Sequence, residues 1–257
     1  MRPRPFPGRR RLGTSVARSY AAWWLYHLLT ADAVSLQKPT KDRYVYEFLG
    51  HDLGRVADLG CGPGVFTRYL CQHARQVYAG DIDQRALLRT FSRHAKQANL
   101  APVVTLVNEL PFGNASLDTV LFLEVLEHLD DDRGALREVN RVLVPSGRLI
   151  VSVPVPPGEV NSGEKWGHKR EGYSFRELDA LLRSANFKVV RHAYAVFRYS
   201  RVAIRLVNSW RRYLHLPAPF FLGWPTYFDL LLELERRQQG DFEPADLIAL
   251  AEKQDPI

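Results

Sequence analysis

Cysteine and long apolar runs are scarce in this sequence of 257 residues. The two cysteines, Cys61 and Cys71, are too few for a disulfide framework or a cysteine-ligated metal, so we expect both to be reduced and predict no metal site. No stretch approaches the roughly 18 uninterrupted apolar residues of a membrane-spanning helix, and the N-terminus lacks the apolar run of a signal peptide. The sequence therefore predicts a cytoplasmic protein.

Acidic residues are missing from the two segments that carry much of the positive charge. The formal net charge is +7, and residues 1–18 hold six arginines while residues 198–216 hold five. Neither segment contains an acidic residue, so the remainder of the chain is acidic. This distribution argues against a uniformly basic nucleic-acid-binding domain, and we expect no specific nucleic-acid partner.

The chain divides into a short arm and a single predicted domain. Residues 1–13 combine proline, glycine and arginine without apolar periodicity, which predicts a flexible basic arm. Residues 14–257 have a length typical of one domain. Within it we expect a helical cap over residues 14–50, a core over residues 55–154 and a helical insertion over residues 196–240.

Apolar runs of strand length alternate with helical patterns, which is typical of βαβ units and predicts an α/β fold with a mostly parallel sheet. The seven predicted strands are Arg55 to Leu59, Gln76 to Gly80, Val103 to Val107, Thr119 to Leu123, Arg148 to Val153, Lys188 to Ala195 and Asp246 to Ala251. The predicted helices begin near Thr14 and then cover Lys41 to Leu49, Gly64 to His73, Gln84 to Ala98, Asp131 to Leu143 and Ser174 to Ala185. A turn is predicted at residues 144–147, and it would end one helix and begin the next strand.

A glycine-rich turn follows the first predicted strand. Gly60, Gly62 and Gly64 lack a Cβ, so the backbone there can approach a ligand closely at the start of a helix. The third glycine stands one place too early for the dinucleotide pattern G-x-G-x-x-G, in which it would occupy the place of Val65. This spacing disfavours a nicotinamide-dependent oxidoreductase, which remains the weakest alternative.

This turn, with Asp58 two residues before Gly60, resembles motif I of class I S-adenosylmethionine (SAM)-dependent methyltransferases, specifically those of the type 11 kind. The resemblance continues over about residues 55–154, through Asp81, Leu110-Pro111-Phe112, Leu123-Glu124-Val125-Leu126-Glu127-His128-Leu129 and Pro145-Ser146-Gly147-Arg148-Leu149. It implies a three-layer Rossmann-like sandwich with an antiparallel last strand, and SAM as the cofactor.

The resemblance also implies roles for single residues. Asp58 would lie near the methionine moiety, Asp81 would accept hydrogen bonds from the ribose, and Ile82 would lie beside adenine. The cofactor-binding set is Asp58, Gly60, Cys61, Gly62, Gly64, Asp81, Ile82, Asn108, Leu123 and Glu124. Asn108 replaces the acidic adenine neighbour that relatives often have. The alternatives are a buried structural carboxylate at Asp58, a helix cap at Asp81 and a surface carboxylate at Glu124.

SAM carries its own electrophilic methyl group, so the protein mainly aligns a nucleophile and excludes water. Where the acceptor is a hydroxyl, a base helps, and the candidates are His128 and His168. The alternative for both is packing or capping. Trp166 and Tyr173 could line an acceptor pocket or simply pack.

Residues 198–216 place aromatic and aliphatic side chains on one helical face and arginines opposite. This segment is predicted either to contact a membrane surface, admitting a lipid-like acceptor, or to form an ordinary covering helix. We therefore predict a methyltransferase acting on a small-molecule or lipid-like acceptor. A non-catalytic SAM-binding scaffold is the second hypothesis.

Overall fold

A computed structural model describes residues 37–156, 167–197, 233–234, 237 and 244–254. The predicted arm (1–13), the helix near Thr14, Trp166, the segment 198–216 and most of the insertion 196–240 lie outside the described residues. What the sequence predicts for these segments therefore stays a prediction. Within the described part, no helix is both long and apolar enough to cross a membrane.

Seven strands form one sheet in the order β3-β2-β1-β4-β5-β7-β6. Their bounds are β1 Arg55–Leu59, β2 Gln76–Asp81, β3 Leu100–Val104, β4 Leu117–Leu123, β5 Leu143–Pro154, β6 Phe187–Ala195 and β7 Asp246–Lys253. Strands β1 to β5 pair in parallel, whereas β7 lies antiparallel between β5 and β6. The predicted Rossmann-like topology with one antiparallel last strand is confirmed.

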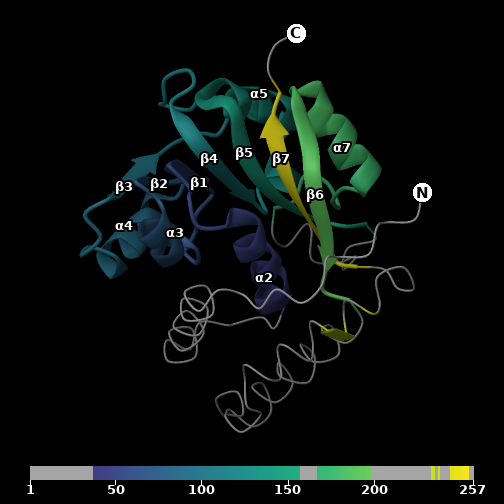
Figure 1. Ribbon diagram of the computed structural model, residues 1–257, viewed down its shortest axis with the longest axis horizontal. Coiled ribbons are helices and arrows are strands. Elements are labelled where there is room, and N and C mark those ends of the chain that lie inside the picture. Colours follow the sequence, from purple (N-terminus) through teal and green to yellow (C-terminus); the bar gives the residue numbers. More distant parts are fainter. Residues whose placement is uncertain (1–36, 157–166, 198–232, 235–236, 238–243, 255–257) are drawn as a thin grey trace, which may run out of the picture.

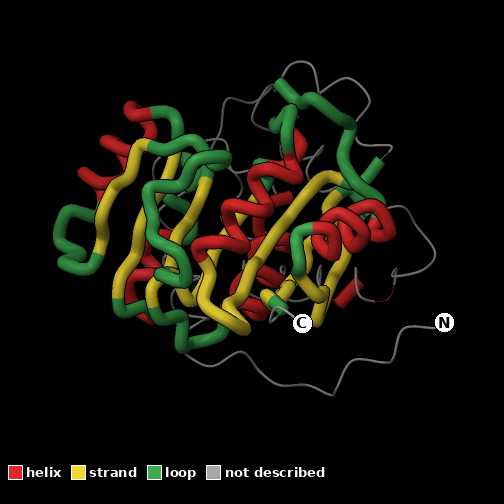
Figure 2. The backbone as a smooth tube through the Cα atoms, turned by 90° about the horizontal axis from the view of Figure 1, so that it is seen from above, coloured by secondary structure: helices red, strands yellow, loops and turns green. Residues whose placement is uncertain are grey.

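Helices cover both faces of the sheet (Figures 1 and 2). Their bounds are α2 Gln37–Leu49, α3 Thr67–His73, α4 Gln84–Arg93, α5 Asp132–Val142 and α7 Phe175–Ser184, with a short 3-10 turn, η1, at Leu126–His128. Side chains alternate along the strands, so Leu121 packs with α2, α3 and α4, whereas Val120 and Phe122 pack with α5 and α7. The core therefore has two halves separated by the sheet.

Several predicted boundaries were wrong. Helix α2 begins at Gln37 rather than Lys41, α3 begins at Thr67 rather than Gly64, and β5 begins at Leu143 rather than Arg148. Strand β3 ends at Val104, three residues before the predicted end, because it is an edge strand that tolerates Pro102 and leaves Val104 59% exposed. The sequence had instead placed this strand on the apolar run from Val103 to Val107. Helix α4 ends at Arg93 rather than Ala98, with His94 at its C-cap.

The turn predicted at residues 144–147 lies inside β5. Leu117 pairs with Leu143 and Thr119 pairs with Arg148, so these four residues bulge out of the β4–β5 pairing. Ser146 takes a left-handed backbone at φ 57 there. The turn chemistry interrupts the pairing without ending the strand.

Candidate cofactor and acceptor site

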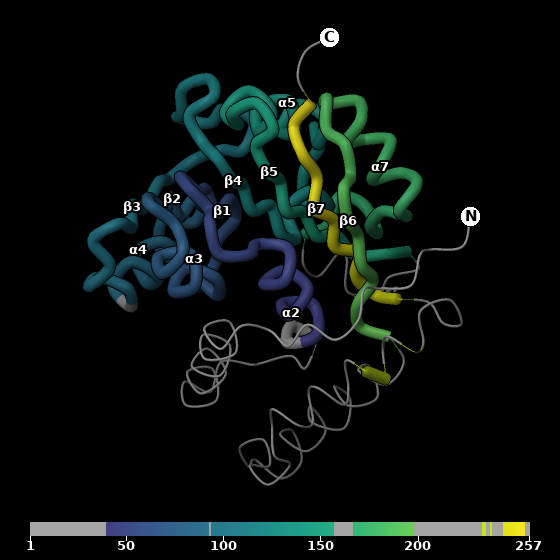
Figure 3. The backbone as a smooth tube through the Cα atoms, in the orientation of Figure 1, coloured from purple at the N-terminus to yellow at the C-terminus, as the bar shows by residue number. Residues whose placement is uncertain are grey.

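The chain order reverses at β1, so the loops after β1 and β4 diverge at the carboxyl ends of the strands. From β1 the chain moves outward to β2 and β3, then returns to place β4 on the other side of β1 (Figure 3). Loops that follow parallel strands on either side of such a reversal diverge and leave a ligand-binding crevice at the carboxyl ends. The loops after β1, β2 and β4 contain most of the predicted cofactor residues.

The glycine-rich loop is fixed by backbone hydrogen bonds to β2. The amides of Gly60 and Cys61 both donate to the Gly80 carbonyl, at 2.8 and 3.0 Å. Gly60 has φ 76, and a Cβ there would lie 2.5 Å from a methyl group of Val125. Gly62 also has a left-handed φ of 49, but a Cβ there would meet no atom within 4 Å. The loop thus presents open backbone at Gly62.

Asp81 joins this loop to the end of β2. Its two carboxylate oxygens accept hydrogen bonds from the amides of Gly62 and Asp83, each at 2.9 Å. The cap of α4 is the neighbouring Asp83, which accepts from the Arg85 amide. Because each carboxylate oxygen can accept a second hydrogen bond, Asp81 can hold the loop and still receive ribose hydroxyls.

Asp58 is a buried carboxylate beneath the loop. It is 3% exposed, and its Oδ2 atom has no hydrogen-bond partner among the described residues. Burial, with a smaller contribution from Asp81, raises the pKa of Asp58 to about 7. An unpartnered buried carboxylate next to a glycine cradle suits a cationic ligand such as SAM, so the residues present fit that cofactor.

Cys61 and Leu123 contribute packing at this crevice. Cys61 is 7% exposed, and burial raises the pKa of its thiol, which therefore stays protonated. Leu123 is partly buried against the half of the core that includes α3. The predicted cofactor role of these two residues stays a prediction.

The predicted adenine neighbours lie at the outer end of the crevice. Ile82 is 69% exposed, and Leu106 in the loop after β3 is 57% exposed, so apolar surface is present for a flat ring. Asn108 is exposed, and its side-chain amide donates to the Asp131 carbonyl at 3.1 Å. Asp131 is the N-cap of α5, so Asn108 is tied to that helix. Its adenine role stays a prediction.

Glu124 forms an ion pair that the sequence analysis missed. It follows β4 with a left-handed backbone at φ 55, lies 3.2 Å from Lys41 Nζ and accepts from the Ser152 hydroxyl at 2.8 Å. Burial alone would raise the pKa of Glu124, but Lys41, Ser152 and His168 outweigh it and lower that pKa. Glu124 is thus an ionised, anchored carboxylate.

Lys41 was detectable in the sequence. Its spacing places it on the same face of α2 as Tyr44, Val45 and Phe48, which are all buried. A lysine on an apolar helical face indicates a buried partner. Burial alone would lower the pKa of Lys41, but Glu124 and nearby acidic groups raise it, so the lysine is charged.

The two predicted catalytic histidines are neighbours. The rings of His128, in η1, and His168 meet edge to face, with centroids 4.7 Å apart. Burial and His128 lower the pKa of His168, against the opposing effect of Glu124. Between them and the core lies Glu127, 1% exposed, where burial and Glu124 raise the carboxyl pKa to about 8.

Tyr173 takes the packing role rather than the acceptor-pocket role. It is 4% exposed and donates to the Asp132 carboxylate at 2.9 Å, so it belongs to the core under α5. The acceptor-pocket alternative for Tyr173 was wrong because the hydroxyl is already used inside the fold.

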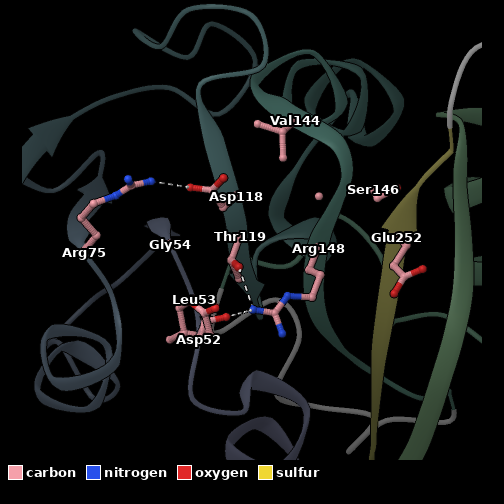
Figure 4. A pocket seen from close by; sticks show the side chains of 11 residues that line it. Asp52, Leu53, Gly54, Arg75, Asp118, Thr119, Val144, Ser146, Arg148 and Glu252 are labelled. Atoms are coloured by element: carbon pink, nitrogen blue, oxygen red, sulfur yellow. Dashed lines mark hydrogen bonds and ion pairs between the residues drawn. The ribbon is translucent and has the colours of Figure 1, made fainter.

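A separate pocket lies at the opposite edge of the sheet, where β1 and β4 begin (Figure 4). Its lining includes Asp52, Asp118, Thr119 and Arg148. The Arg148 guanidinium already donates to the carbonyls of Leu49 and Asp52 and to the Thr119 hydroxyl. Asp118 is held by Arg55 and Arg75. These groups stabilise the strand ends and lie away from the glycine-rich loop.

The fold is Rossmann-like, and the groups at the carboxyl ends of β1 and β2 suit a nucleoside-containing cofactor. Residues 57–151 match the family model described as a methyltransferase domain. Within this region the chain is similar to SAM-dependent methyltransferases, and that similarity supports SAM as the cofactor.

Curated relatives are similar over this region. A probable SAM-dependent methyltransferase of Mycobacterium tuberculosis is 39% identical over 140 residues, covering 51% of this chain and 48% of that protein. The O-methyltransferase cnsE of Penicillium expansum is 30% identical over 144 residues, covering 52% of each. The chain spans about half the length of the curated relatives it matches.

Solved structures share the fold at low identity. The N-methyltransferase NodS of Bradyrhizobium japonicum, in complex with S-adenosyl-L-homocysteine, has a TM-score of 0.58 at 16% identity, covering 92% of this chain and 99% of that one. The [4+2]-cyclase SpnF has a TM-score of 0.60 at 19% identity, covering 95% and 98%. The second neighbour is named for a different reaction, so the fold alone does not decide the chemistry.

Proposed function

We propose that this chain transfers the methyl group of SAM to a small-molecule or lipid-like acceptor by direct in-line displacement. The supporting observation is the pair of carboxylates at the crevice: Asp81, which braces the glycine-rich loop, and Asp58, buried with an unpartnered oxygen. SAM supplies the electrophilic methyl group, so the protein needs chiefly to hold it and to orient the acceptor.

The proposed acceptor side lies where β4 and β5 end. Glu124, fixed by Lys41 and Ser152, and the adjoining histidine pair give this side polar and charged groups. The matched proteins include an O-methyltransferase and a demethylmenaquinone methyltransferase. Their names support an acceptor of the small-molecule or lipid-like class for this chain.

Calorimetric titration with SAM tests the cofactor half of the proposal. We expect Asp81→Ala to weaken SAM binding about 10- to 100-fold, because hydrogen bonds to a charged group contribute about 1.5–3 kcal/mol. Asp83→Ala is the matched control: it removes the α4 cap two residues away and should cost stability while leaving SAM affinity nearly unchanged. Equal affinity in the two variants would contradict the assignment of Asp81.

Incubation with isotope-labelled SAM and a lipid or metabolite extract tests the transfer itself. A labelled product that requires active protein is the expected result. SAM binding without any methylated product, across lipid and metabolite fractions, would favour the scaffold hypothesis.

A further inference from the structure

A carboxylate and two imidazoles converge beside the proposed acceptor side. A carboxylate oxygen of Glu127 and one ring nitrogen each of His128 and His168 all lie within 4.8 Å of one another. Glu127 and His128 come from η1, whereas His168 comes from a segment about forty positions later. This cluster therefore depends on the tertiary fold.

One carboxylate oxygen of Glu127 is buried without a hydrogen bond from the described residues. The residue is 1% exposed, and its Oε2 atom has no hydrogen-bond partner within the described ranges. A buried ionised carboxylate is costly unless it is paired or coordinates a metal ion. The geometry supplies no paired cation for Glu127 among the ion pairs of the described residues, but it does supply two imidazoles.

The neighbouring charges are already matched with one another. Lys41 pairs with Glu124 at 3.2 Å, Lys169 with Asp130 at 3.3 Å, and Arg170 with Asp132 at 2.8 Å. Each of these cations is therefore engaged with an acid other than Glu127. A bound cation would therefore give Glu127 the partner that these residues do not supply.

Hydrogen bonds to backbone carbonyls hold the two halves of the cluster together. The Lys169 amide donates to the Glu127 carbonyl at 2.8 Å, and the Arg170 guanidinium donates to the Leu129 carbonyl at 3.4 Å. His128 Nδ1 lies 3.3 Å from the Gly167 carbonyl. A histidine that donates from Nδ1 to a carbonyl presents the lone pair of Nε2, as metal-binding histidines commonly do.

We propose that Glu127, His128 and His168 bind a divalent first-row transition metal ion, for which Zn²⁺ is the best match to two imidazoles and one carboxylate. Three protein ligands of these types leave a further coordination position open. With bonds of about 2.0–2.1 Å, tetrahedral ligand atoms lie about 3.4 Å apart, so the ligand atoms, now within 4.8 Å of one another, must approach by up to about 1.4 Å. Side-chain rotation can supply that movement.

His128 and His168 would then be metal ligands rather than the predicted general base, because a ring lone pair that binds a metal ion cannot also accept a proton. The proposed metal site also departs from the sequence prediction of no metal, which considered only the cysteines. The metal site does not depend on the proposed methyl transfer. If the protein binds Zn²⁺ but transfers no methyl group, the metal site stands and the proposed function is contradicted. If it transfers a methyl group but binds no Zn²⁺, the proposed function stands and the metal site is contradicted.

The test is a titration of untagged, metal-stripped full-length protein with Zn²⁺, followed by calorimetry, and with Co²⁺, followed by its visible absorption. We expect one ion per chain. Glu127→Gln, His128→Ala and His168→Ala should each weaken Zn²⁺ binding more than about 100-fold, beyond the 10- to 100-fold effect typical of outer-shell partners. Far-UV circular dichroism and SAM titration establish that each variant is folded.

His51→Ala is the matched control. His51 and His73 form another ring pair, with centroids 5.0 Å apart, and no carboxylate completes a three-ligand group with them in the described part of the chain. This variant should bind Zn²⁺ like the unmodified protein. Failure of the unmodified protein to bind either ion, or an equal loss in His51→Ala, would overturn the proposal. If a ligand variant does not fold, X-ray absorption spectroscopy of the unmodified protein decides, since it must show two imidazole ligands.

Discussion

At the scale of single residues, Asp58 has the clearest pH signature. Its pKa is raised by burial to about 7 in the folded chain, against about 3.9 in an unfolded chain. The folded state therefore holds a proton that the unfolded state releases, and stability falls as the pH rises from about 4 to about 7. A tenfold difference in proton affinity between the two states corresponds to about 1.4 kcal/mol.

Urea unfolding of the unmodified protein and of Asp58→Asn, between pH 4 and pH 8, measures this effect. We expect the unmodified protein to lose stability relative to the variant as the pH rises, by up to a few kcal/mol, because asparagine cannot ionise. Parallel curves for the two proteins would contradict the raised pKa.

Asp118→Asn serves as the control of opposite sign. Burial alone would raise the pKa of Asp118. Hydrogen bonds from Arg55 and the charges of Arg55 and Arg75 outweigh burial, so the pKa of Asp118 is lowered. The stability that ionised Asp118 contributes is present above its pKa in the unfolded chain and is lost as the pH falls through its pKa in the folded chain. The difference between the unmodified protein and this variant should therefore shrink on acidification.

At the scale of elements, helix α2 is anchored to the end of β4 by Lys41 and Glu124. We expect Lys41→Met and Glu124→Gln each to lower the free energy of unfolding by about 1–3 kcal/mol. Breaking a fully buried ion pair usually costs about 3–5 kcal/mol, and we expect less here because Glu124 is partly exposed. The double variant should lose less than the sum, since it leaves no unpaired charge. Urea unfolding of all four proteins measures the coupling.

A second ion pair on α2 provides the comparison. Glu47 and Arg191 lie 2.6 Å apart, but both side chains are more exposed to solvent than Lys41. Their coupling energy should stay below about 1 kcal/mol, as for other surface pairs. Equal coupling in the two pairs would show that burial does not strengthen the Lys41–Glu124 contact.

The sequence predicted elements well where periodicity and burial agree. Strand β1 and the boundaries of α5 follow from apolar patterns with turn chemistry at their ends. Strand β3 was misplaced because an edge strand need not be apolar throughout. Local patterns do not encode contacts between segments that are distant in the chain. Two such contacts are the ion pair of Lys41 with Glu124 and the proximity of Glu127 to His168.

At the scale of the whole molecule, cofactor binding should stabilise the fold. A ligand at 100 times its dissociation constant adds about 2.7 kcal/mol when it binds only the folded state. We expect the thermal unfolding midpoint to rise with SAM and with S-adenosyl-L-homocysteine, and to stay unchanged with NAD⁺. Protection by NAD⁺ but not by SAM would revive the oxidoreductase alternative.

The position of β7 bears on the order of events during synthesis. In Figure 3 this strand, yellow, lies between β5 and β6, and β6 pairs with no other strand of the described sheet. A ribosome must therefore complete residues 246–253 before β6 gains a hydrogen-bonded neighbour. Until then, the nascent chain can assemble only the five parallel strands, with β5 exposing an unpaired edge to other chains. Synthesis of residues 246–253 thus determines when the edge of β5 becomes covered.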